Sequence, residues 1–398
     1  MKILVAHNRY HYRGGEDTVV EVEIALLRER GHEVELYSRD NSELHNIAMG
    51  SAALSALWSR QTIKEVQQRC RDFKPDLIHA HNTFPLISPS LYGAADAMRI
   101  PVVQTLHNFR LICPQAMLLR HGRVCEDCVG HLPWRAVVHR CYRNSTAQSA
   151  LTATILTLHR WLGTWNKRVS RYIVLNNLCR EKFMQGGLPA ARLRIKPNFV
   201  RSTRVPHWED RQGGIFIGRL SAEKGITVLA QAMSALPTLR IDVFGKGPMQ
   251  AIVESTPGMQ YGGFQSPAQL VDRLHKAAYL VAPSTGVESF GLVAIEAFCC
   301  GTPVIATRHG GLSDLIEHGK TGLLVPPGDA NALKDAMRWA ECHPEAMVQM
   351  GKAARAEYLR CYTPEHNYDI LFSIYQEALV DRLSRLNGLD HAQNRAGC

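Results

Sequence analysis

Cationic side chains follow a predicted strand in the second half of the chain, at a spacing that suits a phosphorylated ligand. The apolar run 215–217 leads into Gly218-Arg219-Leu220-Ser221-Ala222-Glu223-Lys224-Gly225, where a helical pattern begins. Gly218 permits close approach of a backbone, Arg219 offers a fork for two phosphate oxygens, and Lys224 offers a mobile charge. Because the free amides of a helix N-terminus also favour anions, the segment predicts a diphosphate site. The alternative is a surface Arg and Lys flanking a tight turn.

Two acidic side chains form a second signal, in Glu288-Ser289-Phe290-Gly291-Leu292-Val293-Ala294-Ile295-Glu296. Glu288 lies in a loop of small residues, and Glu296 lies inside an apolar helical pattern where a carboxylate is unexpected. A carboxylate can accept hydrogen bonds from vicinal hydroxyls, as one does with ribose in dinucleotide-binding folds. The backbone amides of 290–292 offer a further anion site. For Glu296 alone, a half-exposed helix carboxylate is the alternative.

The elements that must position these residues alternate between strand and helix patterns. Strands are predicted at 2–6, 32–37, 76–80, 101–106, 171–175, 214–218, 240–245, 279–282 and 303–306, with helical segments between them. This alternation predicts an α/β protein with two doubly wound, Rossmann-like domains. We expect domains at 1–200 and 201–363, with a helix and tail at 364–398 packing back toward the first. Ligands of such sheets bind beyond the carboxyl ends of the strands. Neither a dinucleotide-binding G-x-G-x-x-G after a strand nor a P-loop occurs.

Together these motifs resemble the retaining glycosyltransferases of family 4 (group 1), which have the two-domain GT-B fold with an interdomain cleft. The G-R-L-x-x-E-K-G loop and the E-x-x-F-G-x-x-x-E segment carry the resemblance, with Phe244–Pro248, Ala282–Ser284 and Gly310-Gly311 in support. The resemblance implies sugar transfer from a nucleoside diphosphate-sugar to a saccharide acceptor, with no cofactor required. It assigns the diphosphate to Arg219 and Lys224, the donated sugar to Glu288, and the ribose to Glu296. Other implied donor contacts are Gly218, Gly245, Phe264 at the nucleobase, and the amides of Phe290, Gly291 and Leu292.

The first domain resembles the family through Gly14-Gly15 and through His107, which follows a predicted strand. The resemblance implies that the two glycines approach the phosphates. We expect His107 to bind and position the donor sugar, with a structural strand-end histidine as the alternative. Many relatives have Asp where this chain has Asn108. A neutral amide cannot raise imidazole basicity as a carboxylate does, which argues against a base role for His107. His7, His79 and His81 are expected to be structural or rim residues.

Positive charge is concentrated in the first half of the chain. Residues 101–200 hold 15 basic and 3 acidic side chains, whereas residues 201–398 hold 19 and 20. Such a segment attracts an anionic partner, and we expect an anionic membrane surface or a lipid-diphosphate-linked acceptor rather than nucleic acid. The segment 149–165 places Trp and Leu beside basic residues, which suits an interfacial helix; a core-facing helix is the alternative. A merely solubilising surface is the alternative for the charge.

Four cysteines lie within or beside this basic segment, in the pattern C-x11-C-x2-C-x12-C formed by Cys113, Cys125, Cys128 and Cys141. One C-x-x-C with two flanking cysteines supplies enough ligands for a structural zinc that would pin an insertion at about 107–143. A redox pair or ordinary buried thiols are the alternatives.

Composition sets the remaining bounds. With 398 residues, 45% hydrophobic and 21% charged, the chain has ordinary globular character. It shows neither a signal-peptide pattern nor an apolar run long enough to span a membrane, so we expect a cytosolic protein, at most peripheral to the inner face of the plasma membrane. The functional hypothesis is a glycosyltransferase of surface polysaccharide synthesis. The alternatives are a GT-B epimerase or hydrolase and, from another class, a zinc-bearing nucleic-acid-binding protein.

Overall fold

The computed structural model of the protein describes residues 1–11, 14–202 and 204–395. The chain divides into two compact units. Unit 1 consists of Met1–Ala116, Asp127–Lys196 and Tyr368–Cys398, and unit 2 of Met117–Glu126 and Pro197–Asn367. The division at 196/197 lies four residues before the boundary expected from the sequence. Part of the expected insertion at 107–143, the segment 117–126, groups with unit 2 rather than unit 1.

Unit 1 contains a parallel sheet of six strands in the order β2-β1-β3-β4-β7-β8. The strands are β1 (Lys2–Arg9), β2 (Glu33–Asp40), β3 (Leu77–Ala80), β4 (Val102–Thr105), β7 (Arg171–Val174) and β8 (Leu193–Ile195). Residues 3–6 of β1 are buried on both faces, the pattern of a parallel sheet covered by helices. The strand order reverses between β1 and β3, the point at which sheets of this kind bind ligands.

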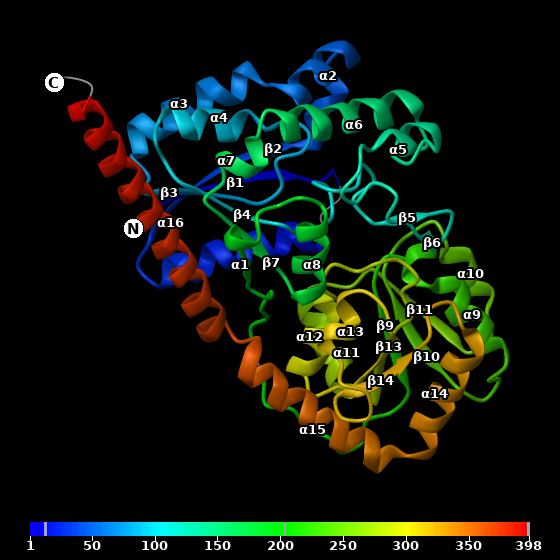
Figure 1. Ribbon diagram of the computed structural model, residues 1–398. Coiled ribbons are helices and arrows are strands. Elements are labelled where there is room, and N and C mark those ends of the chain that lie inside the picture. Colours follow the sequence, from blue (N-terminus) through cyan, green and yellow to red (C-terminus); the bar gives the residue numbers. More distant parts are fainter. Residues whose placement is uncertain (12–13, 203, 396–398) are drawn as a thin grey trace. The chain divides into compact units, whose positions relative to one another are not determined.

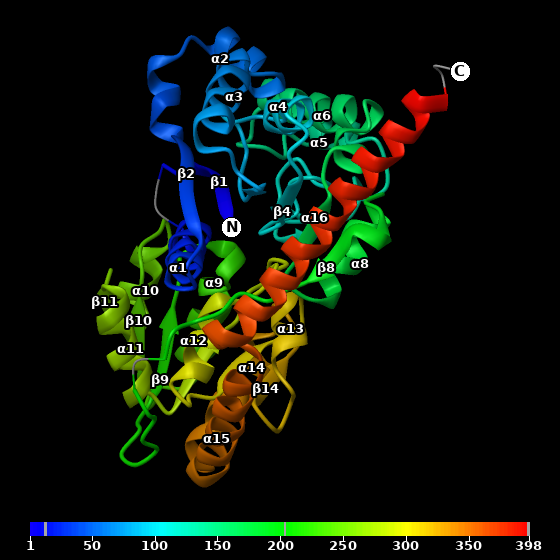
Figure 2. The same cartoon turned by 90° about the vertical axis from the view of Figure 1, so that its left-hand side faces the viewer.

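Helices cover both faces of this sheet, with α2, α3, α4 and α6 on one side and α1, α8 and α16 on the other (Figures 1 and 2). The helices of unit 1 are α1 (Gly15–Glu29), α2 (Met49–Leu57), α3 (Arg60–Phe73), α4 (Ser90–Ala97), α5 (Trp134–Val138), α6 (Thr146–Trp161), α7 (Thr164–Lys167), α8 (Asn177–Gln185) and most of α16 (Pro364–Arg395), with 3-10 turns η1 (Asn41–Asn46) and η2 (Ala190–Arg192).

The long helix α16 belongs to the core of unit 1, although it ends the described chain. Its Leu371, Ile374 and Tyr375 are buried in one cluster with strand residues such as Val5 and with Ile24 of α1. Each such side chain contributes about 1.5–3 kcal/mol of apolar burial. The helix is therefore part of the packing that holds the N-terminal sheet together.

Unit 2 contains a second parallel sheet, in the order β11-β10-β9-β12-β13-β14. The order reverses between β9 and β12, as in dinucleotide-binding sheets. Its strands are β9 (Gly214–Ile217), β10 (Ile241–Phe244), β11 (Met259–Gly263), β12 (Tyr279–Ala282), β13 (Val304–Thr307) and β14 (Gly322–Val325), beside a short hairpin of β5 (Leu119–Arg120) and β6 (Arg123–Val124). Its helices are η3 (Ala222–Lys224), α9 (Ile226–Ser234), α10 (Gln250–Ser255), α11 (Pro267–Lys276), α12 (Leu292–Cys299), α13 (Gly311–Leu315), α14 (Ala330–Cys342) and α15 (Pro344–Cys361).

The prediction of two doubly wound α/β domains is confirmed, and the nine predicted strands agree with the observed ones to within three residues at each end. Three edge strands (β8, β11 and β14) and the hairpin were not predicted. None of the described helices combines the length and the apolar character needed to cross a bilayer.

Candidate active site

The loops after β9 and β12 meet where the strand order of unit 2 reverses. Gly225, which follows η3, has φ +77°, and a Cβ there would lie 1.9 Å from the carbonyl oxygen of Pro283. Only glycine tolerates both this backbone conformation and this approach. The amide of Thr285 also donates to the carbonyl oxygen of Glu223 at 2.9 Å. These backbone contacts hold the predicted phosphate loop against the loop that carries the first predicted acid.

Lys224 and Glu288 form an ion pair across these two loops. The Lys224 Nζ lies 2.8 Å from the Glu288 Oε1, which also accepts a hydrogen bond from the Ser284 hydroxyl. Burial alone would raise the pKa of Glu288, but the charge of Lys224 and the hydrogen bonds from Lys224 and Ser284 together hold this pKa below its ordinary value. Glu288 is therefore an ionised carboxylate at neutral pH, mostly enclosed and with a cation beside it.

Helix α12 begins directly after this loop. Gly291 caps it with φ +98°, so the chain turns sharply from Glu288 into the helix. The ring of Phe290 is buried and packs edge-on against Tyr362, which leaves its backbone rather than its side chain for any ligand. Glu296 lies partly buried in α12, and burial raises its pKa to about 7. Two acids eight positions apart thus have opposite pKa shifts.

The remaining predicted donor residues of unit 2 lie at the carboxyl ends of β9, β10 and β11. Gly245 has φ +141°, and a Cβ on it would lie 1.8 Å from the carbonyl oxygen of Gly218, so the two backbones are in direct contact. Arg219 is exposed beside them. Phe264 follows β11 and is 70% exposed, with the Lys246 Nζ 5.5 Å from its ring centroid. An exposed ring next to a cation is available for stacking against a planar ligand.

A cavity of about 630 Å³ lies at the amino ends of the strands of this sheet, opposite the carboxyl ends, among residues that precede the strands. Arg211, which lines this cavity, donates hydrogen bonds to the Thr302 hydroxyl and to the carbonyl oxygens of His207 and Cys300. Its guanidinium is therefore occupied in joining loops. The charged side chains of Lys224 and Glu288 lie at the carboxyl ends of the strands, where we place the candidate site.

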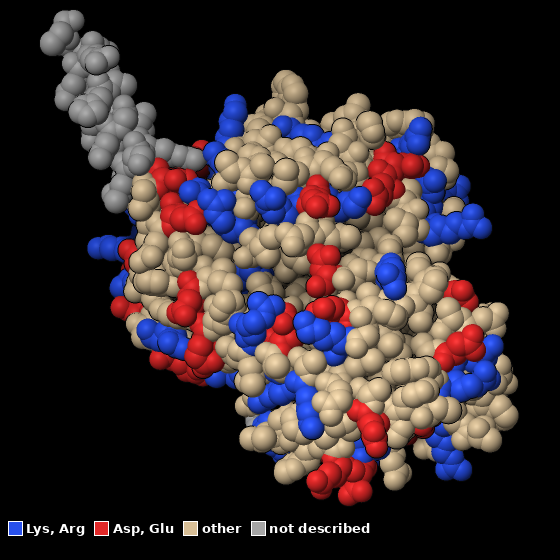
Figure 3. All heavy atoms as spheres, turned by 60° about the horizontal axis from the view of Figure 1, so that its bottom comes forward, with Lys and Arg blue, Asp and Glu red and all other residues tan. Residues whose placement is uncertain are grey.

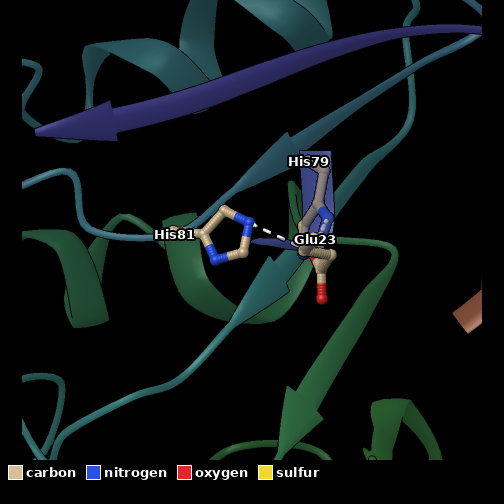
Figure 4. Close-up of side chains that lie close together, drawn as sticks. All are labelled: Glu23, His79 and His81. Carbon is tan, nitrogen blue, oxygen red and sulfur yellow. Dashed lines mark ion pairs between the residues drawn. The ribbon is translucent and has the colours of Figure 1, made fainter. Parts of the chain in front are cut away.

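In unit 1, His107 follows β4 and is buried next to His81, which follows β3. The His81 Nδ1 lies 2.9 Å from the His107 Nε2, and burial lowers the pKa of each ring to about 3. Figure 4 shows the carboxylate of Glu23, from α1, beside His79 and His81, at 3.2 Å from the His79 Nδ1 and 3.3 Å from the His81 Nε2. Its other oxygen lies 2.9 Å from the Lys196 Nζ. The predicted sugar-binding histidine is thus the outer member of a buried polar cluster.

Glu23, His79 and His81 offer two imidazoles and one carboxylate, a ligand set that suits zinc. Burial alone would raise the pKa of Glu23. Lys196 and the two histidines nevertheless hold this pKa well below its ordinary value. The Tyr375 hydroxyl lies 2.7 Å from the His79 Nδ1. Because an ammonium already balances the carboxylate, a metal ion here would compete with Lys196.

The loop that leads into α1 is held by Asp17. Its carboxylate accepts a hydrogen bond from the Gly14 amide at 2.8 Å and lies 2.8 Å from the His7 Nε2. Among the described residues, a Cβ on Gly14 would meet only this carboxylate, at 3.9 Å, and Gly15 is exposed. The packing of unit 1 therefore leaves open space at Gly14.

Asn108, where many relatives have Asp, contacts a carboxylate. Its Nδ2 donates to the Glu16 Oε1 at 2.7 Å, and the Tyr10 hydroxyl donates to the other oxygen of Glu16 at 2.8 Å. An Asp in place of Asn108 would put two carboxylates in contact. The amide of Asn108 is thus suited to the carboxylate of Glu16.

The four cysteines of the expected zinc site are divided between the two units, so the zinc site stays a prediction. Within the described ranges, only Glu23, His79 and His81 bring three potential metal-ligating atoms within 4.8 Å of one another. Cys125 belongs to the segment 117–126 of unit 2, whereas Cys113, Cys128 and Cys141 belong to unit 1. The structure therefore gives no geometry for the predicted four-cysteine site.

Comparison with known proteins gives the family. Residues 205–357 match the family model described as Glycosyl transferases group 1, and residues 13–204 match Glycosyltransferase Family 4. A D-inositol 3-phosphate glycosyltransferase of Saccharomonospora viridis is 31% identical over 332 residues, which are 77% of this chain and 70% of that protein. The chain belongs to the group 1 glycosyltransferases.

Solved glycosyltransferase structures of the GT-B type share the fold. Sucrose-phosphate synthase of Thermosynechococcus elongatus superposes with a TM-score of 0.73 at 19% identity, covering 96% of this chain and 99% of that one. Alr3699/HepE of Anabaena, in complex with UDP, superposes with a TM-score of 0.62 at 18% identity, covering 97% and 100%. Two other curated relatives are matched over only 56% and 41% of their own length, so the chain spans about half of them.

Within each unit, the structure brings together much of what the motifs predict for this glycosyltransferase. In unit 2 it joins Lys224 to Glu288 and places Gly218 against Gly245. In unit 1 the motifs did not predict the contacts of Glu23 and Lys196. A signal for Glu23 was present, because it lies on the same helical stripe as Val20, Ile24 and Leu27, where a carboxylate is unexpected.

Proposed function

We propose that this group 1 glycosyltransferase moves a sugar from a nucleoside diphosphate-sugar to a saccharide acceptor, with retention of the anomeric configuration. The observation that carries the proposal is the enclosed, ionised Glu288 held beside Lys224 at the switch point of unit 2. A carboxylate suits the hydroxyls of a donated sugar, and a cation beside it suits the phosphate to which that sugar is attached.

The chemical task of the site is to stabilise a departing diphosphate. Arg219 and Lys224 place two cations on the loop after β9, and the amides at the start of α12 add a partial positive charge. Preorganised charge of this kind stabilises the developing anion without a metal ion in the step. In a front-face route, the leaving phosphate itself accepts the proton of the acceptor hydroxyl, which needs no separate base.

The other proposed contacts are made to the same nucleoside diphosphate-sugar. Glu296 accepts hydrogen bonds from the ribose hydroxyls, and the exposed ring of Phe264 stacks on the nucleobase. Gly14 and Gly15 lie next to the donor phosphates, and among the described residues a Cβ on Gly14 would meet only the Asp17 carboxylate. His107 binds the donor sugar as a neutral imidazole, because its pKa of about 3 keeps it uncharged.

We further propose that the acceptor is a lipid-diphosphate-linked saccharide of a surface polysaccharide, reached at the inner face of the plasma membrane. Trp134, Val138, Trp161 and Leu162 are 50–82% exposed on or beside α5 and α6, two helices that pack together. Ile155 in the same segment is buried, so α6 has a core face and an exposed apolar end. Trp and Leu at a surface suit the interfacial zone of a bilayer.

Basic residues are the second support for a membrane partner. Arg135 and Arg160 lie within the two helices, and the Arg160 side chain donates to the carbonyl oxygen of His131 at 3.1 Å, which ties the end of α6 to the approach to α5. On the face drawn in Figure 3, Lys and Arg are interspersed with Asp and Glu. Each basic residue near such a surface contributes about 1 kcal/mol.

Vesicle sedimentation tests the membrane proposal. We expect binding to vesicles of phosphatidylglycerol and phosphatidylcholine at low salt, weaker binding at high salt, and little binding to phosphatidylcholine alone. Trp161→Ser should weaken binding, whereas Leu359→Ser, which removes a 55% exposed apolar side chain from α15, should not. Absence of binding at either salt concentration would exclude the membrane as a partner.

The transfer proposal is tested by a thermal-shift screen of UDP-, GDP- and ADP-sugars, followed by turnover on the compound that stabilises the protein. NMR of the first product distinguishes retention from inversion. Hydrolysis without transfer to any saccharide, or stabilisation by no nucleotide sugar, would contradict the proposal.

A further inference from the structure

The buried cluster of unit 1 contains a chain of contacts that ends at His107. Lys196 lies against one oxygen of Glu23, the other oxygen of Glu23 faces His81, and His81 contacts His107 through its second nitrogen. These residues come from α1 and from the loops after β3, β4 and β8. All four side chains are less than 8% exposed. Burial makes their hydrogen positions matter, because a buried polar group that faces the wrong partner is costly.

A carboxylate can only accept hydrogen bonds, and this fixes the direction of the chain. Within the described residues, neither the Glu23 Oε1 nor the His81 Nε2 has a partner of ordinary hydrogen-bond geometry, and the two atoms lie 3.3 Å apart. If the His81 Nε2 carried a lone pair, it would face a negative oxygen with no hydrogen between them. The favourable tautomer of a neutral His81 therefore carries its hydrogen on Nε2.

The second nitrogen of His81 then determines the state of His107. With its hydrogen on Nε2, His81 has a lone pair on Nδ1, and the His107 Nε2 lies 2.9 Å from it. One hydrogen must lie between these two nitrogens, so it belongs to His107. We propose that Glu23, acting through His81, holds His107 as the tautomer with hydrogen on Nε2 and a lone pair on Nδ1.

The consequence rests on the proposed function and deepens it. Toward a donor sugar, a His107 of this tautomer can only accept a hydroxyl hydrogen through Nδ1, since its one N–H is engaged with His81. Glu23 and His81 are then positioning residues, and His107 is the group that touches the substrate. Burial supports this arrangement, because a pKa of about 3 keeps both rings neutral.

A metal ion in the same cluster would give His81 and His107 the opposite tautomers. A metal on Glu23, His79 and His81 needs the lone pair of the His81 Nε2, which moves the hydrogen of His81 to Nδ1. His107 would then accept at Nε2 and carry its hydrogen on Nδ1. The ammonium of Lys196, 2.9 Å from the carboxylate, favours the metal-free arrangement.

Nitrogen-15 NMR of the full protein at neutral pH tests the assignment without any substrate. We expect a coupling across the hydrogen bond that joins a protonated Nε2 of one histidine to an unprotonated Nδ1 of another. Loss of both signals in His107→Gln identifies the pair. A protonated Nδ1 on His107, or a reversal caused by stoichiometric zinc in the purified protein, would overturn the proposal.

Two variants of equal size separate positioning from packing. His81→Phe removes the acceptor of the His107 N–H, whereas His79→Phe removes a neighbouring ring that contacts Thr105, Tyr375 and Glu23. We expect the tautomer signal of His107 to be lost only in His81→Phe, with kcat/KM at least about tenfold lower than in His79→Phe. Equal kcat/KM in the two variants would overturn the positioning role. If the wild-type protein turns over no nucleotide sugar, the proposed function fails, while the NMR result still decides the tautomer.

Discussion

Replacing Glu296 by Gln should stabilise the protein above neutral pH while weakening donor binding. Burial raises the pKa of Glu296 to about 7, from an ordinary value of 4.5. Between these two pH values the folded state holds a proton that the unfolded state has released. Stability contributed by this group is therefore highest below about pH 4.5 and falls as the pH rises to about 7.

The size of the effect follows from the shift. A difference of about 2.5 pKa units corresponds to about 3 kcal/mol, at about 1.4 kcal/mol per unit. Gln has nearly the same shape and no charge at any pH, so Glu296→Gln removes this penalty. We expect the variant to match wild type at pH 4.5 and to exceed it by up to about 3 kcal/mol at pH 8.

Denaturant unfolding at several pH values measures the difference, because groups common to both proteins cancel. Glu288→Gln is the matched control, since it makes the same chemical change in the same segment where Lys224 and Ser284 lower the pKa. Its stability loss should develop as the pH rises toward 4.5 and be fully present above that value, with the opposite sign. A difference between Glu296→Gln and wild type that does not depend on pH would refute the reasoning from burial.

Other predictions concern the two loops and the first domain. Lys224→Ala and Glu288→Ala should each lower transfer by about 100-fold or more, measured as product formation, with circular dichroism unchanged; wild-type rates in both would remove the site assignment. Asn108→Asp should destabilise the protein by about 1–3 kcal/mol at pH 7 because it faces Glu16, and Glu16→Gln should restore the loss; no change at pH 7 would contradict the contact. Gly245→Ala should lower the melting temperature and the donor-induced thermal shift together, since its Cβ would meet a backbone oxygen at 1.8 Å; a normal thermal shift would show that the loop is not part of the site.

The sequence was sufficient to predict the fold class, because it depends on local signals, whereas the place of the donor site stays a prediction. Strands and helices alternate with their own periodicities, and the residues after β9 and β12 converge once the sheet order is known. Edge strands such as β8 and β14 were missed because they are short and carry weak alternation. The four-cysteine site stays a prediction, because spacing along the chain does not show that Cys125 groups with unit 2.

Contacts between residues far apart in the chain could not be predicted in this way. Glu23 and Lys196 are separated by 173 positions, and the apolar stripe around Glu23 does not show which residue pairs with it. What makes them a pair is that both are excluded from water, and that exclusion is a property of packing. The same holds for Asn108, whose departure from the family's Asp is explained only when Glu16 is seen beside it.

Glu288 and Glu296 show most clearly what spacing determines and what it does not. Both were predicted as ligand-binding carboxylates from one motif. Glu288 lies in the loop before α12, and Glu296 lies within that helix. Their charge states differ because Lys224 reaches one of them, while burial alone acts on the other. A motif therefore specifies the position of an acidic residue in the chain. The protonation of that residue depends on whether a cation contacts it in the folded protein. For that reason Glu288 is expected to act as an anion throughout the physiological range, and Glu296 is expected to bind ribose more tightly as the pH rises through about 7.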